Sequence, residues 1–303
     1  MKKYIRSPLF YVGDKYKILN QVVKHFPQNI NSFVEPFVGG GSVFLNVDAL
    51  NYNLNDYDYH LIELHKFLTQ TTNKKLLNFI GKNITKYGLS KSYKKDIVPD
   101  SLKKKFIKTY YAKFNKDAFL QMRLDFNINH NNYGLLYMLL IYGFNRMLRF
   151  NSTGDYNIPV GNVDFNKNVV TALNDYFIAI KKRKIKFNNY DYKKFLSMIK
   201  FKKNDFIYFD PPYLISASEY NKHWNEDMEH ELLSTLDDLN SKKIKWALSN
   251  VVIYRGKKNK ILDKWMHKYN VHTVKSNYIS FNDNTIKKFK EVLITNYGWK
   301  EVK

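Results

Sequence analysis

The stretch Phe206-Ile-Tyr-Phe209 constrains the fold most, because these four apolar residues run directly into Asp-Pro-Pro-Tyr. A run this short and apolar is typical of a strand buried on both faces, as in a parallel sheet. Two successive prolines cannot continue a β-ladder, so the strand should end at Asp210. Open α/β sheets bind ligands beyond the carboxyl ends of their strands. Asp210 can accept a hydrogen from an amino group and Tyr213 can stack on a ring, so this turn suits a flat, amino-bearing substrate. An ordinary strand-to-loop turn with a solvated Asp is the alternative.

A second predicted strand, residues 32–37, leads into a glycine-rich turn, Gly39-Gly-Gly-Ser42, after which a helix is predicted to begin at Val43. Strand, glycine-rich turn and helix are typical of a nucleotide-type cofactor site. A dinucleotide fingerprint would need glycine at position 44, and a P-loop would need lysine after its last glycine, so a phosphate ligand is disfavoured. The next predicted strand, 52–56, ends in Asp56, and an acid there usually binds ribose hydroxyls. A cofactor with an amino-acid end and a ribose fits, although a plain tight turn is the alternative.

Charge and aromatic content point to a polyanionic partner. Lys and Arg number 50 against 27 Asp and Glu, which gives a formal net charge of +23. Such an excess favours nucleic acid, and 24 Tyr with 22 Phe leave aromatic rings for stacking on bases. The chain has no Cys, which excludes disulfides, zinc-thiolate sites and a cysteine nucleophile. Its 8 His form no convincing metal cluster in the sequence.

Nothing in the sequence indicates membrane insertion. No apolar run approaches the ~18 residues that a membrane span needs, and the amino-terminal residues lack a signal-peptide core. We therefore expect no membrane association and a cytoplasmic location.

The composition changes in the middle of the chain. Residues 66–155 hold 17 Lys and Arg but only 5 Asp and no Glu. We expect a separate, basic, mostly helical domain here, with helices at 59–70, 115–123 and 134–145. The α/β pattern then resumes, with helices at 166–182, 195–201, 225–240 and 258–269, strands at 185–187, 246–250, 271–275 and 291–296, and a lid at 214–224.

A hairpin is predicted at 145–161, where two arms of mixed polarity flank Ser152-Thr-Gly-Asp155. Arg149, Asn151 and Asn157 are residue types that read guanine and adenine edges, so the hairpin is a candidate for DNA contact. An ordinary hairpin with polar faces is the alternative.

Taken together, these motifs resemble the DNA adenine methyltransferase (Dam) family, whose members transfer a methyl group from S-adenosylmethionine to the exocyclic amino group of adenine. Residues 33–42 resemble its cofactor loop, Asn55-Asp56 its second cofactor motif, and 210–213 its catalytic motif. Tyr11, Gly13 and Lys15 resemble its Trp-x-Gly-Gly-Lys motif, with Tyr in place of Trp and Asp14 in place of Gly. Residues 145–161 match its DNA-reading hairpin at most motif positions, although Arg146 stands where the family commonly has glycine.

The resemblance implies the fold and the roles of individual residues. It implies an α/β, Rossmann-like methyltransferase sheet, mostly parallel with an antiparallel last strand, over 1–60 and 165–303. The inserted, mainly helical target-recognition domain with its β-hairpin is expected at 61–164. The catalytic residues would be Asp210, Pro211, Pro212 and Tyr213. S-adenosylmethionine would be held by Tyr11, Lys15, Glu35, Pro36, Phe37, Gly39, Gly40, Gly41, Ser42, Asp56 and Asp210. Duplex DNA would be contacted by Phe144, Asn145, Arg149, Asn151, Asn157 and Pro159.

The resemblance also implies how the enzyme acts and with which partners. We expect a monomeric, site-specific methyltransferase that flips adenine out of duplex DNA. A restriction–modification system would supply a cognate restriction endonuclease as functional partner, while a phage or housekeeping role stays open. RNA adenine or protein glutamine methylation on the same fold is one alternative, and a catalytically silent DNA-binding module is another.

Overall fold

The computed structural model describes residues 3–216, 224–275 and 289–298. The chain forms two compact units, each assembled from three segments. One, the helical unit, comprises Met1–Asp14, Gly39–Leu45 and Asp58–Lys182. The other, the sheet unit, comprises Lys15–Val38, Asn46–Tyr57 and Arg183–Lys303.

The sheet unit is built on one eight-stranded sheet whose main order is β3-β2-β1-β4-β5-β8-β7, with β6 pairing β5. Pairings among the first five strands of that order are all parallel, and β8 runs antiparallel to both β5 and β7. This confirms the predicted mixed α/β class, the mostly parallel sheet and the antiparallel last strand. The strands are β1 (Ile30–Glu35), β2 (Ala49–Asn55), β3 (Lys184–Asn188), β4 (Phe206–Phe209), β5 (Lys245–Tyr254), β6 (Lys257–Lys258), β7 (Asn270–Val274) and β8 (Phe289–Thr295).

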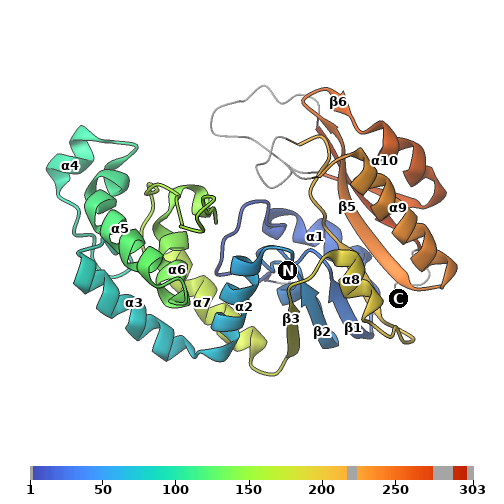
Figure 1. The fold of residues 1–303 in the computed structure, drawn as a ribbon, viewed down its shortest axis with the longest axis horizontal. Helices are drawn as coiled ribbons and strands as arrows, with labels where there is room; N and C mark the ends of the chain where they lie inside the picture. The colour runs from blue at the N-terminus through green and yellow to red at the C-terminus, as the bar shows by residue number, and fades with distance from the viewer. Residues whose placement is uncertain (1–2, 217–223, 276–288, 299–303) are drawn as a thin grey trace. The chain divides into compact units, whose positions relative to one another are not determined.

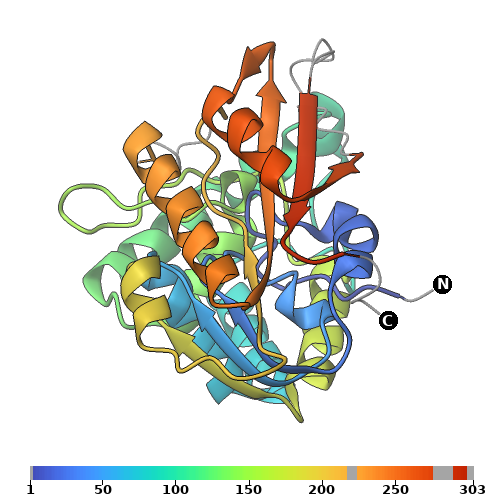
Figure 2. The same ribbon diagram turned by 90° about the vertical axis from the view of Figure 1, so that its right-hand side faces the viewer.

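Strand β4 lies at the centre of the sheet unit, and all four of its residues are fully buried. Ile207 and Phe209 belong to the core that also includes residues of α8, α9 and α10, whereas Phe206 and Tyr208 pack against Phe26 with ring centroids 4.8 and 5.2 Å away. Figures 1 and 2 show α9 and α10 lying along β5. Burial on both faces explains why β4 contains only apolar and aromatic residues. The helices of this unit are α1 (Leu19–Val22), α8 (Tyr192–Ser197), α9 (Glu226–Ser241) and α10 (Lys260–Trp265), with 3-10 turns at Tyr16–Ile18, Val23–His25 and Met266–Lys268.

The helical unit packs around α6, whose residues from Gly134 to Tyr142 are all buried. A helix that is apolar on every side must be covered on every side, and other helices of the same unit pack around this one. The helices of this unit are α2 (Tyr59–Gln70), α3 (Asn73–Tyr87), α4 (Asp100–Lys105), α5 (Tyr110–Ile128), α6 (Tyr133–Tyr142) and α7 (Lys167–Ile180), with a 3-10 turn, η4, at Phe144–Arg146. No helix of the described residues is long and apolar enough to cross a membrane.

Three sequence predictions need correction. The helix expected after the glycine-rich turn is a single 3-10 turn, η3 (Phe44–Asn46), because residues 41–47 are all buried and leave no solvent-facing side for an amphipathic helix. The helix expected to reach residue 145 ends at Tyr142, since Gly143 is extended. The helix expected at 195–201 begins earlier, at Tyr192, where the Asp191 side chain caps it. Most of the predicted lid, residues 217–223, lies outside the described residues.

Candidate active site

Asp210 lies at the carboxyl end of β4, at the point where the strand order of the sheet reverses. Strand β1 pairs with β2 on one side and with β4 on the other, and Val34 is in register with Ile207. The next residue of β1, Glu35, is its last, so the ends of β1 and β4 lie side by side at the same edge of the sheet. Such a reversal is where open α/β sheets bind their ligands. The fold therefore puts the Asp-Pro-Pro-Tyr turn where the sequence predicts a ligand crevice.

Three side chains of the sheet unit, Lys15, Asp210 and Tyr213, form a closed triangle at this turn. The Lys15 ammonium lies 2.8 Å from Asp210 Oδ1 and donates to the Tyr213 hydroxyl at 2.6 Å. The Tyr213 hydroxyl in turn donates to Asp210 Oδ1 at 2.8 Å. Lys15 also lies 5.0 Å from the centroid of the Tyr213 ring. The structure therefore brings together two residues of the predicted catalytic motif and one of the predicted cofactor residues.

The electrostatics of this triangle centre on a buried cation. The Lys15 side chain is only 4% exposed, and the buried carboxylate of Glu291 on β8 lies 3.9 Å from its ammonium as a second partner. Burying an ammonium is costly unless carboxylates and hydrogen-bond acceptors surround it, as they do here. Beneath the turn, the Tyr208 hydroxyl shares a 2.7 Å hydrogen bond with Ser249, and burial raises the Tyr208 pKa well above its usual value. Tyr208 is therefore neutral, and the charge at this site resides on Lys15 and the nearby acids.

The carboxyl ends of β1 and β2 are tied together by Asn55. Its side-chain NH2 group donates to the backbone carbonyls of Pro36 and Tyr190, each at 3.0 Å. Its backbone carbonyl accepts from Val38 N at 2.8 Å. Asp56 follows directly and is half-buried. Of the predicted cofactor residues, Glu35, Pro36, Phe37 and Asp56 thus lie along this one edge of the sheet unit.

The glycine loop, residues 39–42, belongs to the helical unit and is packed against Tyr11. A Cβ on Gly40 would lie 2.7 Å from the Cβ of Tyr11, so only glycine fits. Gly41 has φ +77°, and a Cβ there would lie 2.4 Å from the ring of Phe44. Both positions require glycine because of how the loop packs, and they bring Tyr11 together with the loop as predicted.

Two residues that support this loop were not predicted as functional. Ser7 Oγ donates to the carbonyl of Gly40, and the His65 side chain on α2 donates from Nε2 to the carbonyl of Gly39 at 2.8 Å. Burial lowers the pKa of His65 to about 4, which keeps it neutral. In the sequence His65 shares the helical spacing of its apolar neighbours, so no local signal distinguishes it from an ordinary core residue.

The predicted hairpin forms, and its arms are joined by two isolated bridges, Gly143 with Val160 and Phe150 with Tyr156, and by further backbone hydrogen bonds. Arg149 Nε donates to Asn157 Oδ1 at 2.8 Å, so two of the predicted DNA-contacting side chains hold each other. Asn151 Oδ1 accepts from Thr153 N, Thr153 Oγ1 and Asp155 N at 2.7–3.0 Å, which shapes the tip. Of the remaining predicted DNA contacts, Phe144, Asn145 and Pro159 are exposed.

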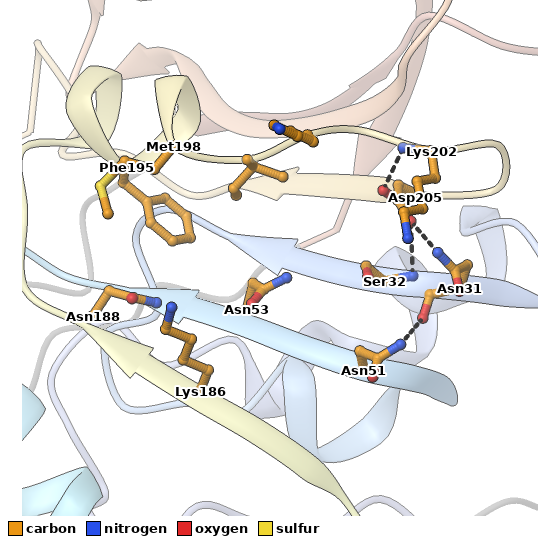
Figure 3. Close-up of a pocket in the computed structure, with 12 residues that line it drawn as sticks. Asn31, Ser32, Asn51, Asn53, Lys186, Asn188, Phe195, Met198, Lys202 and Asp205 are labelled. Carbon is orange, nitrogen blue, oxygen red and sulfur yellow. Dashed lines mark hydrogen bonds between the residues drawn. The ribbon is translucent and has the colours of Figure 1, made fainter.

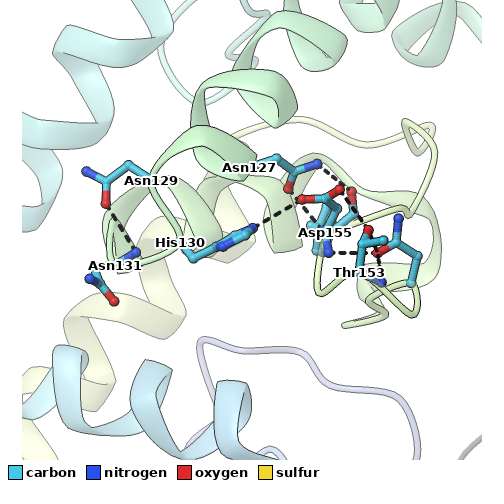
Figure 4. A network of polar contacts seen from close by, with 8 residues as sticks. Asn127, Asn129, His130, Asn131, Thr153 and Asp155 are labelled. Atoms are coloured by element: carbon cyan, nitrogen blue, oxygen red, sulfur yellow. Dashed lines mark hydrogen bonds and ion pairs between the residues drawn. The ribbon is translucent and has the colours of Figure 1, made fainter.

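Polar and ring contacts with the neighbouring helices fix the hairpin near its tip. His60 on α2 stacks on Phe150 with centroids 3.6 Å apart. Asn127 on α5 exchanges two hydrogen bonds with the backbone of Tyr156, and His130 Nε2 lies 3.3 Å from Asp155 Oδ1, as Figure 4 shows. The hairpin is therefore anchored within the helical unit at both its arm and its tip.

The sheet unit also contains two hollows that the residues of the triangle do not line. One, of about 300 Å³, is lined by polar side chains such as Asn53 and Lys186, with Asp205 bound to Asn31 and Ser32 at its rim, and no predicted site residue lines it (Figure 3). The other, of about 760 Å³, is bordered by residues 214–216, just after Tyr213, and by a basic run from Arg255 to Lys260. Within the described residues, no group of three or more His, Asp or Glu is placed to hold a metal ion.

The chain resembles known modification methylases over almost its whole length. It is 36% identical to the modification methylase StsI of Streptococcus sanguinis over 99% of this chain and 44% of that protein. It is also 36% identical to the type II methyltransferase M.FokI of Planomicrobium okeanokoites, over 97% and 43%. The chain thus spans less than half the length of these two relatives. The DNA adenine methylase of Escherichia coli K12 is 27% identical over 97% of this chain and 95% of its own length.

A family model matches most of the chain. The model for D12 class N6 adenine-specific DNA methyltransferases matches residues 11–279, which include Lys15, Asp210 and Tyr213. The family resemblance predicted from the sequence motifs is confirmed by this match and by the relatives. The chain belongs to the D12 class N6 adenine-specific DNA methyltransferase family.

Proposed function

We propose that this chain transfers a methyl group from S-adenosylmethionine to the exocyclic amino group of adenine in duplex DNA. The observation that carries the proposal is the triangle of Lys15, Asp210 and Tyr213 at the carboxyl end of β4. It presents a carboxylate and an aromatic ring together at the strand-order reversal, within a chain of the adenine-specific family. A binding module without catalysis has no need of this arrangement.

Asp210 is the residue that we assign to the target amino group. The lone pair of that nitrogen is delocalised into the adenine ring, which makes it a poor nucleophile. Asp210 Oδ1 already accepts from Lys15 and Tyr213, so we assign Oδ2 to one amino hydrogen and the Pro211 carbonyl to the other. Two acceptors favour a tetrahedral nitrogen whose lone pair points out of the ring plane. Holding the amine in this geometry supplies much of the rate by positioning and electrostatic stabilisation.

Lys15 and Tyr213 orient that carboxylate. The ammonium fixes the rotamer of Asp210 through a 2.8 Å contact, because the charged pair is largely shielded from water. The Tyr213 hydroxyl adds a second donor to the same oxygen, and its ring is the surface that we assign to the flipped base. Pro212 stiffens the turn between them.

The residues present have the chemistry that S-adenosylmethionine requires. In the sheet unit, Asp56 offers a half-buried carboxylate for ribose hydroxyls at the end of β2, and Glu35, Pro36 and Phe37 follow the edge of β1. In the helical unit, Gly39, Gly40, Gly41 and Ser42 offer backbone groups on a loop held by Tyr11, Ser7 and His65. When bound, the cofactor supplies an electrophilic methyl group on a sulfonium. We propose each set as the cofactor residues of its own unit, with Lys15 and Asp210 among those of the sheet unit.

Duplex DNA is the proposed substrate, and the helical unit is the proposed target-recognition domain. A duplex base reaches such a pocket only by flipping out of the stack. The excess of Lys and Arg in residues 66–155 and the exposed side chains at the hairpin base support contact with a polyanion. Modification methylases among the relatives support a role in a restriction–modification system, with a cognate restriction endonuclease as functional partner. We further expect a monomer that acts in the cytoplasm, where such DNA lies.

The test is transfer of labelled methyl groups from S-adenosylmethionine to duplex DNA, RNA and protein, offered separately. We expect label in duplex DNA, with the product identified as N6-methyladenine by mass spectrometry. Asp210→Ala should abolish transfer in protein that still folds, with reduced stability because buried Lys15 loses its nearer carboxylate, whereas Asp227→Ala, which removes an exposed acid of α9, should retain transfer. Label in RNA or protein alone, or turnover by folded Asp210→Ala, would contradict the proposal.

A further inference from the structure

Arg146 adopts a backbone conformation that an arginine rarely takes. Its φ is +52°, and Asn145 before it has φ +51°. A left-handed conformation is unfavourable for a residue with a Cβ, and arginine has no side-chain hydrogen bond to its own backbone that would offset this cost. A conformation of this kind, retained next to a candidate binding surface, is a reason to look for what its side chain does.

The Arg146 side chain stacks on Phe10. Its guanidinium carbon lies 3.9 Å from the centroid of the Phe10 ring, and the guanidinium carbon of Arg6 lies 4.6 Å from the same centroid. Phe10 is only 6% exposed and itself has φ +49°. Burial, with the nearby charge of Arg6, lowers the pKa of Arg146 to about 10, so Arg146 remains a cation at neutral pH.

This stack adds little net stability. A desolvated cation–π pair contributes about as much as the left-handed backbone costs, so the two nearly cancel. Two guanidinium groups share one ring, and within the described part of the chain the Arg146 guanidinium forms no ion pair with a carboxylate. The charge of Asp14 acts on this cation, but no described carboxylate lies within ion-pair distance of it, so its N–H donors are complementary to an external acceptor.

The position of Arg146 indicates which acceptor that is. It lies on the first arm of the hairpin, between exposed Asn145 and exposed Arg149, both candidates for DNA contact. Stacking on Phe10 fixes the guanidinium plane and restricts the rotation of its fork of N–H donors. A fixed fork of this kind matches the O6 and N7 atoms of guanine, the commonest base-specific contact of arginine. The same fork can also bind a phosphate bidentately, and the dependence of methylation on sequence distinguishes the two acceptors.

We propose that Arg146, held by Phe10, reads a guanine in the target duplex and so helps to set the sequence that this chain methylates. The proposal rests on the proposed function and deepens it by naming a base and the residue that reads it. Arg146 acts here as a specificity-determining residue and has no part in the chemical step.

The experiment compares wild type with Arg146→Gly and Arg146→Lys on a duplex library in which each base pair flanking the target adenine is varied. Initial methylation rates are read from every library member by sequencing that detects N6-methyladenine, and duplex affinity is measured by fluorescence anisotropy. Wild type should prefer guanine at one position. Arg146→Gly should lose that preference by roughly ten- to a hundredfold, as expected for a lost bidentate base contact. It should melt no lower than wild type, because glycine accepts a φ of +52°. Arg146→Lys should also lose most of the preference, since an ammonium lacks the planar fork.

Arg183→Lys is the matched control, because its guanidinium lies 4.9 Å from the Tyr52 ring in the sheet unit, an arginine–aromatic contact far from the hairpin in sequence. It should leave the sequence preference unchanged.

Lower stability of Arg146→Gly with an unchanged preference would mean that the stack is only structural and would overturn the proposal. A uniform loss across all sequences, with a salt slope reduced by about 0.9, would identify a phosphate contact and overturn it equally. If wild type methylates no duplex, the proposed function fails instead; the anisotropy library then tests guanine preference in binding alone.

Discussion

The Tyr213 hydroxyl lies 2.8 Å from Asp210 Oδ1, so the first and last side chains of the Asp-Pro-Pro-Tyr turn close on each other. Tyr213 can therefore serve in two ways, through its hydroxyl as a donor to the carboxylate and through its ring as a stacking surface. Substitutions that remove one property at a time separate the two roles.

Tyr213→Phe keeps the ring and removes the hydroxyl, so we expect it to retain base stacking and to lose about tenfold or less in rate. Tyr213→Ala removes both and should lose a further stacking contribution of roughly 1–3 kcal/mol, which corresponds to about one to two decades in rate. Tyr213→Trp should retain more activity than Ala. Rates are measured at low temperature, and 2-aminopurine at the target position reports base flipping. Normal flipping and methylation by Tyr213→Ala, with a defect confined to thermal stability, would refute the stacking role.

Lys15 should be essential to stability as well as to the site. Lys15→Met leaves the carboxylates of Asp210 and buried Glu291 without the cation between them. Removing one partner of a buried ion pair typically costs about 3–5 kcal/mol, so the urea midpoint should fall clearly. Lys17→Met, two residues along and exposed, is the control and should change stability little. Adding Glu291→Gln to Lys15→Met should restore part of the loss; a double variant no more stable than the single one would show that the coupling is absent.

His65 should make the fold sensitive to acid. Its pKa is about 4 in the folded protein and near 6.5 when unfolded, because burial disfavours its charged form. Above pH 6.5 both states are neutral and the full stability is present. As the pH falls from 6.5 towards 4, only the unfolded chain takes up the proton, and the free energy of unfolding drops by an amount of about 3 kcal/mol.

The measurement is the free energy of unfolding from urea titrations between pH 7.5 and pH 4, in steps of about half a unit. His65→Gln, which keeps a donor for Gly39 and does not titrate, should flatten the profile. Part of the slope should persist because burial also lowers the pKa of His25 to about 4. Exposed His267→Gln is the control and should leave the profile as it is. Parallel profiles for His65→Gln and wild type would contradict the assignment.

Affinity for duplex DNA should fall steeply with salt, because Lys and Arg displace counterions condensed on phosphates. Each phosphate contact contributes about −0.9 to the slope of log affinity against log salt. Changing the exposed Lys104, Lys105 and Lys108 to Gln should make the slope shallower. The same change at exposed Lys200, Lys202 and Lys203, on the sheet unit, should leave it nearly unchanged. Affinity that hardly responds to salt would show that the charge excess does not serve DNA binding.

The sequence predicted well those helices and strands whose ends are marked by local residues, such as a capping side chain or a proline. Helix α2 begins and ends where predicted, because Asp58 caps it and its apolar residues keep helical spacing. Strand β4 ends at its prolines for the same kind of reason. The helix expected after Gly41 does not form. The spacing of its apolar residues indicated a helix but could not indicate that the segment is buried on every side.

The contacts that build the site could not be predicted, because they join residues distant in the chain. Lys15 and Tyr213 are 198 positions apart, and nothing near either one indicates that they meet. The hydrogen bond from His65 to the glycine loop could not be predicted from the sequence either, since a buried histidine on an apolar helix face resembles any core residue. Motif spacing predicted a set of site residues, while the hydrogen bonds among them required the fold.

The interleaved path of the chain limits how its specificity can be engineered. The helical unit takes Met1–Asp14 and Gly39–Leu45 from outside its main segment, Asp58–Lys182, so no single excision removes it whole. A chimera that exchanges only the main segment with a relative would transplant the hairpin and Arg146 but leave Phe10 behind. Grafts that carry both short segments along with the long one keep such partners together, and they are the exchange units from which hybrid enzymes of this family should be built.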